Sequence, residues 1–569
     1  MKARLALVAA LAVVGAACVL LKSSANLFAS PYGTVRAETS AANNSTYVLG
    51  QPVEITVSVT GASASKAFVL TAAIRDEFGA KVATLPLSIL TDRGGYGGAT
   101  FNAPASRLGY FEVKVAAPDG ATNGRLGTRP AGVLTYAIVP DPATRVDYGE
   151  AGARFGLQGG FSAGMGAVIP LLGVRYVQAA GGGWTAFEPN NPGQFAADRA
   201  AAVAAGRQHP PKDPLVAAVT FGGSPWSTYS VFWVTIASLP SWAVDAPTKG
   251  ASTSFSALSG ANLANLANFA SALASAVAAD YPAQANHYYQ ITWEPQMSWG
   301  FKGASEQLVQ YYSTTYAAIK AADPKAIVAG PALFVAGKSA DGSVDQMSQM
   351  WAGGLANYID AVSMHPYATP GFPPEAHGYI TDIRGQISKA AAAKGAAMPF
   401  IGTEHGYDSA QYGLLQQAQA NIRQTLIVLG EGFKLDFMFY VADFWDATPS
   451  DASARYGLFY NLSDAVQFGT PRVGPKPAAA AYAAMTYLLD GSTTAGAVSG
   501  LTGSQLGYKF TRGGRTILTV WDWSASTSAN LTIPVGSYTK YDWMGNGVGG
   551  TSSGTVSTLL GGNPIYFVY

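Results

Sequence analysis

The stretch Tyr288–Glu294, YYQITWE, is a short apolar run that ends in a carboxylate. A second run of the same kind, Met398–Glu404 (MPFIGTE), ends in the same residue type. Each run predicts a buried strand, and a helical pattern lies behind each of them. A charge at the end of a buried strand is costly unless the fold needs it there. We therefore take Glu294 and Glu404 as candidate catalytic residues.

A repeated order of strand, loop and helix surrounds these two runs, from about residue 154 to residue 489. Between the predicted strands, apolar residues such as Leu266, Phe269 and Leu273 recur at helical spacing. The predicted strands cover residues 154–158, 174–178, 215–221, 288–293, 326–330, 359–364, 399–403 and 435–442. For the third strand, residues 231–237 are an equally good candidate. The economical interpretation is an α/β fold, a (β/α)8 TIM barrel over residues 150–489.

Alternation of apolar and polar residues marks the chain on both sides of this predicted barrel. Val53, Ile55 and Val57 are apolar, and the residues between them are not, which predicts a half-buried strand. Short strands with turns and without a helical period favour an Ig-like β-sandwich over residues 40–142. Alternation returns after Gly491 and predicts a second β-sandwich over residues 490–569. Part of the N-terminal chain is a candidate to contribute a strand to this second sandwich.

The first 30 residues resemble an export signal. Lys2 and Arg4 precede an unbroken apolar stretch from Leu5 to Leu21, which predicts a signal peptide or a short N-terminal membrane anchor. Cys18 lies inside that stretch, and its surroundings match a lipoprotein box only loosely. No later segment has the ~18 uncharged apolar residues that a membrane span requires. We expect an exported protein, periplasmic or extracellular, with a membrane tether at its N-terminus as an alternative.

The composition narrows the class of protein. A chain of 569 residues with 49% hydrophobic and 12% charged residues favours several well-buried domains over disorder. The net charge of +1 gives no electrostatic footprint for nucleic acid. A single cysteine excludes an internal disulfide framework. We expect a monomer that does not bind nucleic acid.

The predicted strands place the two glutamates at one mouth of the barrel. Glu294 closes the fourth predicted strand and Glu404 the seventh, and active groups of such barrels gather at the C-terminal strand ends. A facing pair of carboxyl groups is the apparatus of glycosidic bond cleavage. A separation of ~5–5.5 Å predicts retention of configuration at the anomeric carbon, and ~6.5–9.5 Å predicts inversion.

Companion residues follow other predicted strands. His365 and Tyr367, after the sixth strand, are suited to hydrogen-bond a carboxylate or a sugar hydroxyl, although a capped loop is an equal alternative. Trp445, after the eighth strand, offers a flat apolar face to a sugar ring. Trp242 and Trp299 also follow strand-like runs, and core packing is the alternative for some of these tryptophans.

Other chemistries lack their sequence patterns. The five histidines show no zinc-binding spacing. The chain has no G-x-S-x-G elbow and no phosphate-binding loop. We expect no metal and no cofactor.

Several short motifs, taken together, resemble those of clan A glycoside hydrolases, and among them family 39. The matching motifs are Leu172–Arg175, Ser238–Trp242, Thr292–Pro295, Asp323–Ala326, Met364–Tyr367, Gly402–His405, Gly474–Pro477 and Gly562–Tyr566. This family includes β-xylosidases, α-L-iduronidases and endo-acting enzymes on bacterial exopolysaccharides. The resemblance implies that Glu294 is the general acid/base and Glu404 the nucleophile. It also implies that His365 and Tyr367 line the sugar site and that Trp445 lies beneath the sugar.

One position departs from the clan pattern. Trp293 stands where the clan usually has an asparagine that binds the sugar 2-hydroxyl. Contacts to that hydroxyl normally strengthen in the transition state. Either another group such as Gln296 supplies the contact, or the substrate differs at C2.

The sequence therefore predicts a retaining glycoside hydrolase, endo-acting on a bacterial extracellular polysaccharide. An exo-acting, β-xylosidase-like glycosidase is the nearest alternative. A non-catalytic carbohydrate-binding protein on a degenerate barrel is the second alternative, and the Trp293 departure is its main support.

Overall fold

A computed structural model provides the structure of the protein. It describes residues 34–39, 44–116, 133–158, 165–180, 183–218, 220–221, 224–225, 230–234, 239–244, 255–256, 258–297, 300–338, 342, 344–443, 455–462 and 472–569. The predicted export segment 1–30, with Cys18, lies outside these residues. Among the helices that are described, none is long and apolar enough to cross a membrane.

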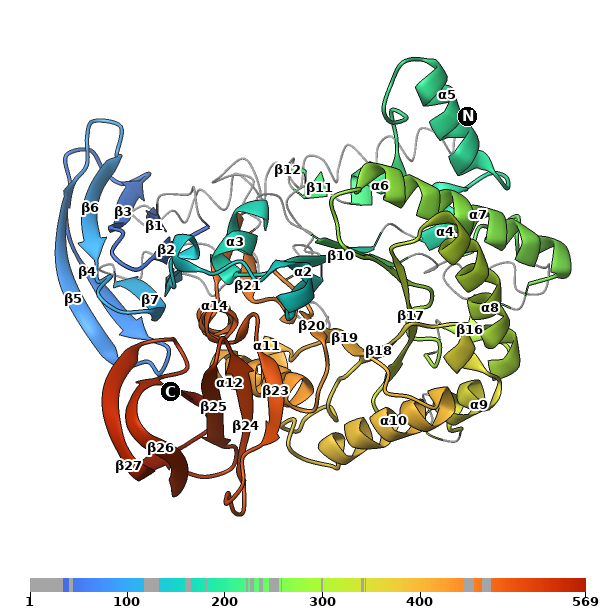
Figure 1. The fold of residues 1–569 in the computed structure, drawn as a ribbon. Helices are drawn as coiled ribbons and strands as arrows, with labels where there is room; N and C mark the ends of the chain where they lie inside the picture. Colours follow the sequence, from blue (N-terminus) through green and yellow to red (C-terminus); the bar gives the residue numbers. More distant parts are fainter. Residues whose placement is uncertain are drawn as a thin grey trace, which may run out of the picture.

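Eight parallel strands form the centre of the molecule (Figure 1). They are β9 (Phe155–Gln158), β10 (Tyr176–Ala180), β13 (Ser230–Val234), β15 (His287–Gln290), β17 (Ala326–Phe334), β18 (Ala361–His365), β19 (Phe400–His405) and β20 (Leu435–Met438). Each strand pairs with the next in this order, and β20 pairs with β9, so that the sheet curls into a closed ring. The predicted α/β class with a curled parallel sheet is confirmed.

Helices follow most of these strands along the chain and cover the outside of the ring (Figure 1). The longer ones are α5 (Gln194–Ala204), α7 (Gly260–Asp280), α8 (Ser305–Ala322), α10 (Tyr379–Lys394), α12 (Leu414–Gly430) and α14 (Pro477–Leu489). Their buried faces are the apolar repeats of the sequence: Leu266, Phe269 and Leu273 of α7 are all buried.

The prediction of the third strand over residues 215–221 is wrong. That segment holds a short helix, α6 (Pro214–Ala218), and a two-residue strand, β11 (Thr220–Phe221). A proline is favourable in the first turn of a helix, and the Asp213 carboxylate accepts a hydrogen bond from the Leu215 N–H at 2.9 Å. Local capping therefore outweighs the apolar pattern here. The alternative segment provides the strand, as β13.

Two layers of side chains stabilise the ring. Inside it, Tyr176, Tyr288, Ile401 and Phe437 belong to one buried cluster. Gly156 leaves room for this layer, because a Cβ there would lie 2.3 Å from the Phe437 ring.

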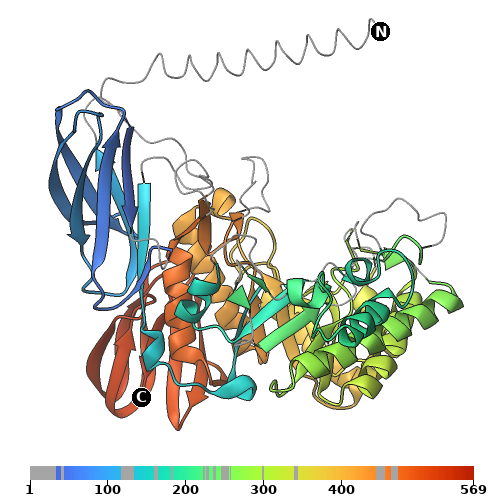
Figure 2. The ribbon, with the colours of Figure 1, turned by 90° about the horizontal axis from the view of Figure 1, so that it is seen from above.

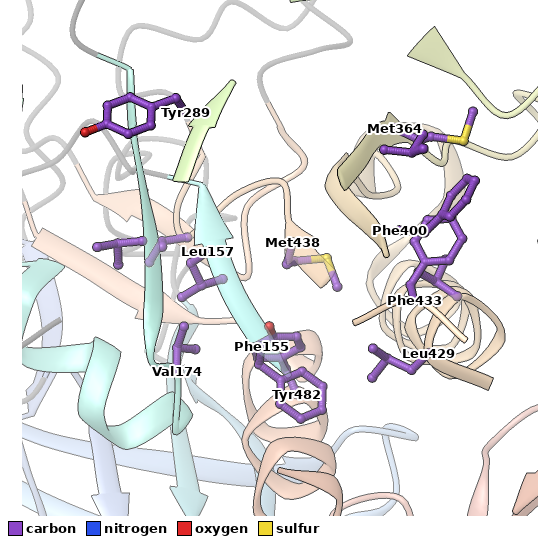
Figure 3. Packing of buried hydrophobic residues seen from close by; sticks show 14 of the residues in the cluster. Phe155, Leu157, Val174, Tyr289, Met364, Phe400, Leu429, Phe433, Met438 and Tyr482 are labelled. Carbon is purple, nitrogen blue, oxygen red and sulfur yellow. The ribbon is translucent and has the colours of Figure 1, made fainter. Parts of the chain in front are cut away.

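Outside the ring, strand residues pack against the helices, as Figure 3 shows for Phe155 and Leu157 beside Tyr482 of α14. On another side of the same cluster, Phe400 of β19 packs near Phe433 and Leu429 (Figure 3). Burial of such side chains contributes ~1.5–3 kcal/mol each.

The N-terminal strands form two sheets with one shared core. One sheet contains β1 (Thr34–Thr39), β3 (Val53–Thr60) and β6 (Gly97–Ala103); the other contains β2 (Thr46–Val48), β8 (Val133–Val139), β7 (Gly109–Ala116), β4 (Ala67–Asp76) and β5 (Lys81–Leu90). The alternation predicted for β3 is confirmed, because Val53, Ile55 and Val57 are buried and the residues between them are not. Figure 2 shows these strands as a separate pair of layers beside the rest of the chain.

The C-terminal region differs from the predicted second β-sandwich. It is one six-stranded sheet of β23 (Thr493–Ala497), β24 (Gln505–Arg512), β25 (Arg515–Asp522), β28 (Ile565–Val568), β26 (Thr527–Tyr541) and β27 (Gly547–Leu560). The sheet curls, so that its own residues, including Leu518, Leu531 and Phe567, form one buried cluster. Its other face packs on α12, where the Tyr508 ring lies against Gly430. Helix α12 of the barrel thus covers the face that a second sheet would cover in the predicted β-sandwich.

No N-terminal strand among the described residues joins this C-terminal sheet. The two regions meet through side chains instead. The Leu108 N–H donates to Asn546 Oδ1 at 2.9 Å, and the rings of Phe78 and Trp543 lie 6.2 Å apart.

Candidate active site

Glu294 lies on a loop, four residues beyond the end of β15. Its backbone has a φ of +41°, which an L-residue rarely adopts, and its side chain is buried. Such a conformation costs of the order of 1–3 kcal/mol and concentrates at functional sites. The loop turns back at once, because the Met297 N–H donates to the Glu294 carbonyl at 3.0 Å. Gly300 packs against that carbonyl, and a Cβ at Gly300 would lie 2.3 Å from its oxygen.

Glu404, in contrast, is part of strand β19 itself and is also buried. One carboxylate oxygen accepts a hydrogen bond from the Tyr367 hydroxyl at 2.9 Å, and the other accepts one from Gln158 Nε2 at 3.1 Å. The next residue, His405, is anchored by Asp436 at 2.6 Å. The carboxylate of Glu404 is therefore held by donors from β9 and from the segment after β18, and the residue after it is anchored to β20.

His365, the last residue of β18, connects the two carboxylates. Its Nδ1 lies 2.9 Å from Oε1 of Glu294 and 3.9 Å from Oε2 of Glu404, and the ring is fully buried. One donor atom from each of these three residues lies within 4.8 Å of the other two. Glu294, after the fourth strand, and Glu404, within the seventh, therefore meet at one end of the ring.

The electrostatics of this cluster favour a retained proton near neutral pH. Burial, together with the Glu294 charge, raises the pKa of Glu404 to about 7, although His365, Tyr367 and Gln158 act to lower it. Burial acts to lower the pKa of His365, but the charges of Glu404 and Glu294 outweigh it and raise that pKa overall. Burial and the same two charges raise the pKa of Tyr367 well above its ordinary value, so that its hydroxyl remains a donor.

A cleft of about 570 Å³ opens above the two glutamates. Its walls come from the segments that follow β15, β17, β18, β19 and β20. Aromatic rings dominate the lining, and they are Phe334, Tyr367, Tyr379, Tyr407, Tyr412, Phe439 and Tyr456. Three of them, Tyr367, Phe439 and Tyr456, contact one another at ring distances of 5.5–6.4 Å. A cleft with aromatic walls and two carboxylates at its floor suits a sugar ring.

The other residues predicted to bind substrate lie in different places. Trp293 packs edge-on against the His365 ring, with ring centres 4.9 Å apart. Gln296 is buried in the loop of Glu294, and within the described part of the chain neither atom of its amide has a hydrogen-bond partner. Trp242 lies away from the cleft lining: it packs against Trp184 and donates to the Glu188 carbonyl at 2.8 Å. Trp242, Trp293 and Gln296 are all absent from the described residues that line the cleft, and their role in substrate binding stays a prediction. Trp299 and Trp445 lie outside the described residues.

Several contributors to the site were not predicted from the sequence, among them Gln158 and Tyr456. Gln158 ends β9 and holds Glu404, and the same rule that identified the glutamates, a polar group at a buried strand end, would have identified it. Tyr456 had no such signal, because it lies in a segment without a recognisable strand or helix.

The three central groups, Glu294, His365 and Glu404, also have the spacing of a metal-binding triad. The contact between His365 Nδ1 and Glu294 Oε1 is also a hydrogen bond, whose donor depends on the tautomer of His365 and on the protonation of Glu294.

Comparison with known proteins gives a fold relationship. No family model matches the sequence, and no curated protein matches it. A family 39 glycoside hydrolase structure from Bacteroides cellulosilyticus has a TM-score of 0.63 at 16% identity, over 93% of this chain and all of that one. A family 39 β-xylosidase from Caulobacter crescentus gives a TM-score of 0.45 at 14% identity, over 74% of this chain and 96% of that one. The similarity to the first of these structures confirms the predicted resemblance to family 39 at the level of the fold.

Proposed function

We propose that this protein is a retaining glycoside hydrolase that uses Glu404 as nucleophile and Glu294 as general acid/base. The observation that carries the proposal is the buried pair of carboxylates whose oxygens approach within 4.8 Å at the mouth of the ring. That spacing fits the ~5–5.5 Å of retaining enzymes and leaves no room for the water of an inverting pair.

The hydrogen bonds support this division of roles. Glu404 accepts bonds from Tyr367 and Gln158, which orient it and favour its ionised form. When Glu294 is protonated, the neighbouring charge that raises the pKa of Glu404 is removed. One proton on Glu294 therefore prepares both groups for the first step.

The reaction then proceeds by double displacement. Glu404 attacks the anomeric carbon while the proton of Glu294 passes to the leaving glycosidic oxygen, so that a covalent glycosyl-enzyme forms and an alcohol departs. In the second step Glu294 takes a proton from water, whose oxygen attacks the anomeric carbon and releases Glu404. His365, bonded to Oε1 of Glu294, orients the carboxyl group so that Oε2 is available to the substrate.

We further propose that the enzyme is endo-acting on a bacterial extracellular polysaccharide. A cleft bordered by five strand-end segments, with aromatic rings along it, suits several sugar units of a chain. In this proposal the ring with its helices is a complete (β/α)8 TIM barrel, flanked by an N-terminal β-sandwich, and residues 1–30 direct export. Gln296, with its unpaired amide, is the candidate to contact the sugar 2-position in place of the missing asparagine.

The test is product sizing after incubation of the purified protein with neutral polysaccharides, among them arabinoxylan, mixed-linkage β-glucan, galactomannan and the producing organism's own exopolysaccharide. Oligosaccharides of mixed length are expected, and they should be absent when Glu404→Gln protein is used. Release of monosaccharide alone would identify an exo-acting glycosidase instead. Binding without any cleavage would identify a carbohydrate-binding protein.

A further inference from the structure

A second cavity, of about 240 Å³, lies between the ring and the C-terminal sheet. One wall comes from the segment after β18 and from α12, which contribute Pro373, Gln416 and Gln419. The opposite wall comes from the C-terminal region, with Trp523 directly after β25 and Gly562 before β28. The cavity therefore exists only because the C-terminal sheet packs on the barrel helices.

The chemistry of the lining suits a neutral sugar. Trp523 is half-buried, so that part of its indole surface remains accessible next to the cavity. Gln416 is exposed and Gln419 is half-buried, and together they offer amide donors and acceptors beside the ring. An aromatic face with amides around it is the usual arrangement for the apolar side and the hydroxyl groups of a sugar.

The charge of the cavity lining is already neutralised. Among the described residues, Arg423 is the only charged one in the lining of this cavity. Its Nε lies 2.8 Å from Oε1 of Glu375, and its Nη1 donates to the Gly562 carbonyl at 2.9 Å. That guanidinium is bonded to groups of the barrel and of the C-terminal region. The described lining therefore holds no unpaired cation that could bind an acidic group.

Tyr407 and Tyr412 join this cavity to the catalytic cleft, because both tyrosines line both spaces. Their rings contact each other with centres 4.9 Å apart. Their hydroxyl groups hold the loop between the two spaces: Tyr407 donates to the Phe372 carbonyl at 3.1 Å, and Tyr412 accepts from the Gly371 N–H. Tyr412 is half-buried, and the neighbouring Phe372 ring is exposed. Aromatic surface therefore continues from the cleft to the second cavity.

We propose that the second cavity is a distal binding subsite for neutral sugar units of the same polysaccharide chain, with Trp523 as its stacking platform. The proposal deepens the proposed function, on which its role in hydrolysis rests. It assigns the C-terminal sheet a part in substrate binding, because Trp523 is supplied by that sheet.

The experiment is native affinity electrophoresis of the full chain through gels that contain each polysaccharide of the panel named above. The wild-type protein is expected to be retarded by at least one neutral polymer. Trp523→Ala should raise the dissociation constant for that polymer about tenfold, the effect of one lost stacking contact. Trp351→Ala is the matched control, because Trp351 is also a half-buried tryptophan on the same core but lies outside this cavity, and it should bind as the wild type does.

Gln416→Ala and Trp523→Phe keep the test decisive if Trp523→Ala does not fold, since Gln416 is exposed and Phe retains a ring. Each should weaken binding about threefold. Wild-type binding by these variants, or no retardation of the wild-type protein in any gel, would overturn the proposal. Cleavage by a wild-type protein whose Trp523 variants bind normally would leave the proposed function standing without the subsite. If the protein cleaves no polysaccharide but its binding depends on Trp523, the binding site is supported and the proposed hydrolase function is contradicted.

Discussion

The two carboxylates of the proposed catalytic pair are held in opposite ways. Glu404 belongs to a central strand, with extended neighbours and two hydrogen-bond donors from other strand ends. Glu294 lies on a loop with a strained backbone, and among the hydrogen bonds described for its side chain is the one to His365. The difference fits their proposed roles. A nucleophile needs a fixed distance to one carbon, whereas an acid/base must serve a leaving group and then a water.

The largest expected effect is the loss of the strand-borne carboxylate. Glu404→Ala should lower turnover about 10⁴-fold or more, since no covalent intermediate can form. Added azide should restore cleavage of an activated aryl glycoside and give a glycosyl azide of inverted configuration, because azide enters through the space that Glu404 leaves. The measurements are steady-state rates and NMR of the azide product, with circular dichroism to verify the fold. A retained azide product would reverse the two roles.

Loss of the loop-borne carboxylate should have an effect that depends on the leaving group. Glu294→Ala should slow cleavage of substrates with a poor leaving group about 10²–10⁴-fold, because they need the proton. A dinitrophenyl glycoside, whose leaving group needs no proton, should still form the glycosyl-enzyme quickly and show a burst. Azide should here give the retained product. Equal losses for both kinds of substrate would contradict the acid/base role.

A smaller effect should follow from disturbing the loop alone. A Cβ at Gly300 would lie 2.3 Å from the Glu294 carbonyl oxygen, so that Gly300→Ala must displace the loop. We expect kcat/KM to fall about 10- to 100-fold, as for a displacement of about 1 Å in a reacting group. Gly385→Ala in α10 is the matched control, because no atom lies within 4 Å of its added Cβ, and it should leave the rate unchanged. Equal rates for both variants would show that the loop does not position Glu294.

The smallest effect concerns the stability of the fold. The pKa of Glu404 is raised from 4.5 to about 7, so the folded state binds its proton more tightly than the unfolded state. Its contribution to stability is present below pH 4.5 and is lost as the pH rises through about 7. Glu404→Gln, which stays neutral, should therefore be more stable than the wild type at pH 8 by about 3 kcal/mol, and by less than about 1 kcal/mol at pH 5. Denaturant unfolding at both pH values measures this, and an equal difference at the two would contradict it.

The strand-borne part of the site could be predicted from the sequence. Buried parallel strands are continuous apolar runs, so that a polar residue at their ends, such as Glu404 or His365, is visible. The same reasoning failed at residues 215–221, where Asp213 and Pro214 begin a helix that the apolar run conceals. It also cannot separate the two roles of an aromatic residue after a strand, since Trp242 packs against Trp184 as a core residue does.

The parts that depend on packing between distant segments could not be predicted. The curled C-terminal sheet needs no partner sheet because α12 covers one of its faces, and no local pattern records that contact. The aromatic residues that line the cleft are mainly tyrosines from separate segments, such as Tyr407 and Tyr456. Their grouping arises from the ring of strands and not from any spacing along the chain.

The configuration of the first-formed product tests the central claim most directly. Proton NMR during the first minutes of cleavage, before the released sugar mutarotates, reports the anomer that leaves the enzyme. A pair of carboxylates with oxygens within 4.8 Å predicts the same anomeric configuration as in the bond that was cleaved. The opposite anomer would show that water attacks directly, and it would contradict the assignment of Glu404 as the nucleophile.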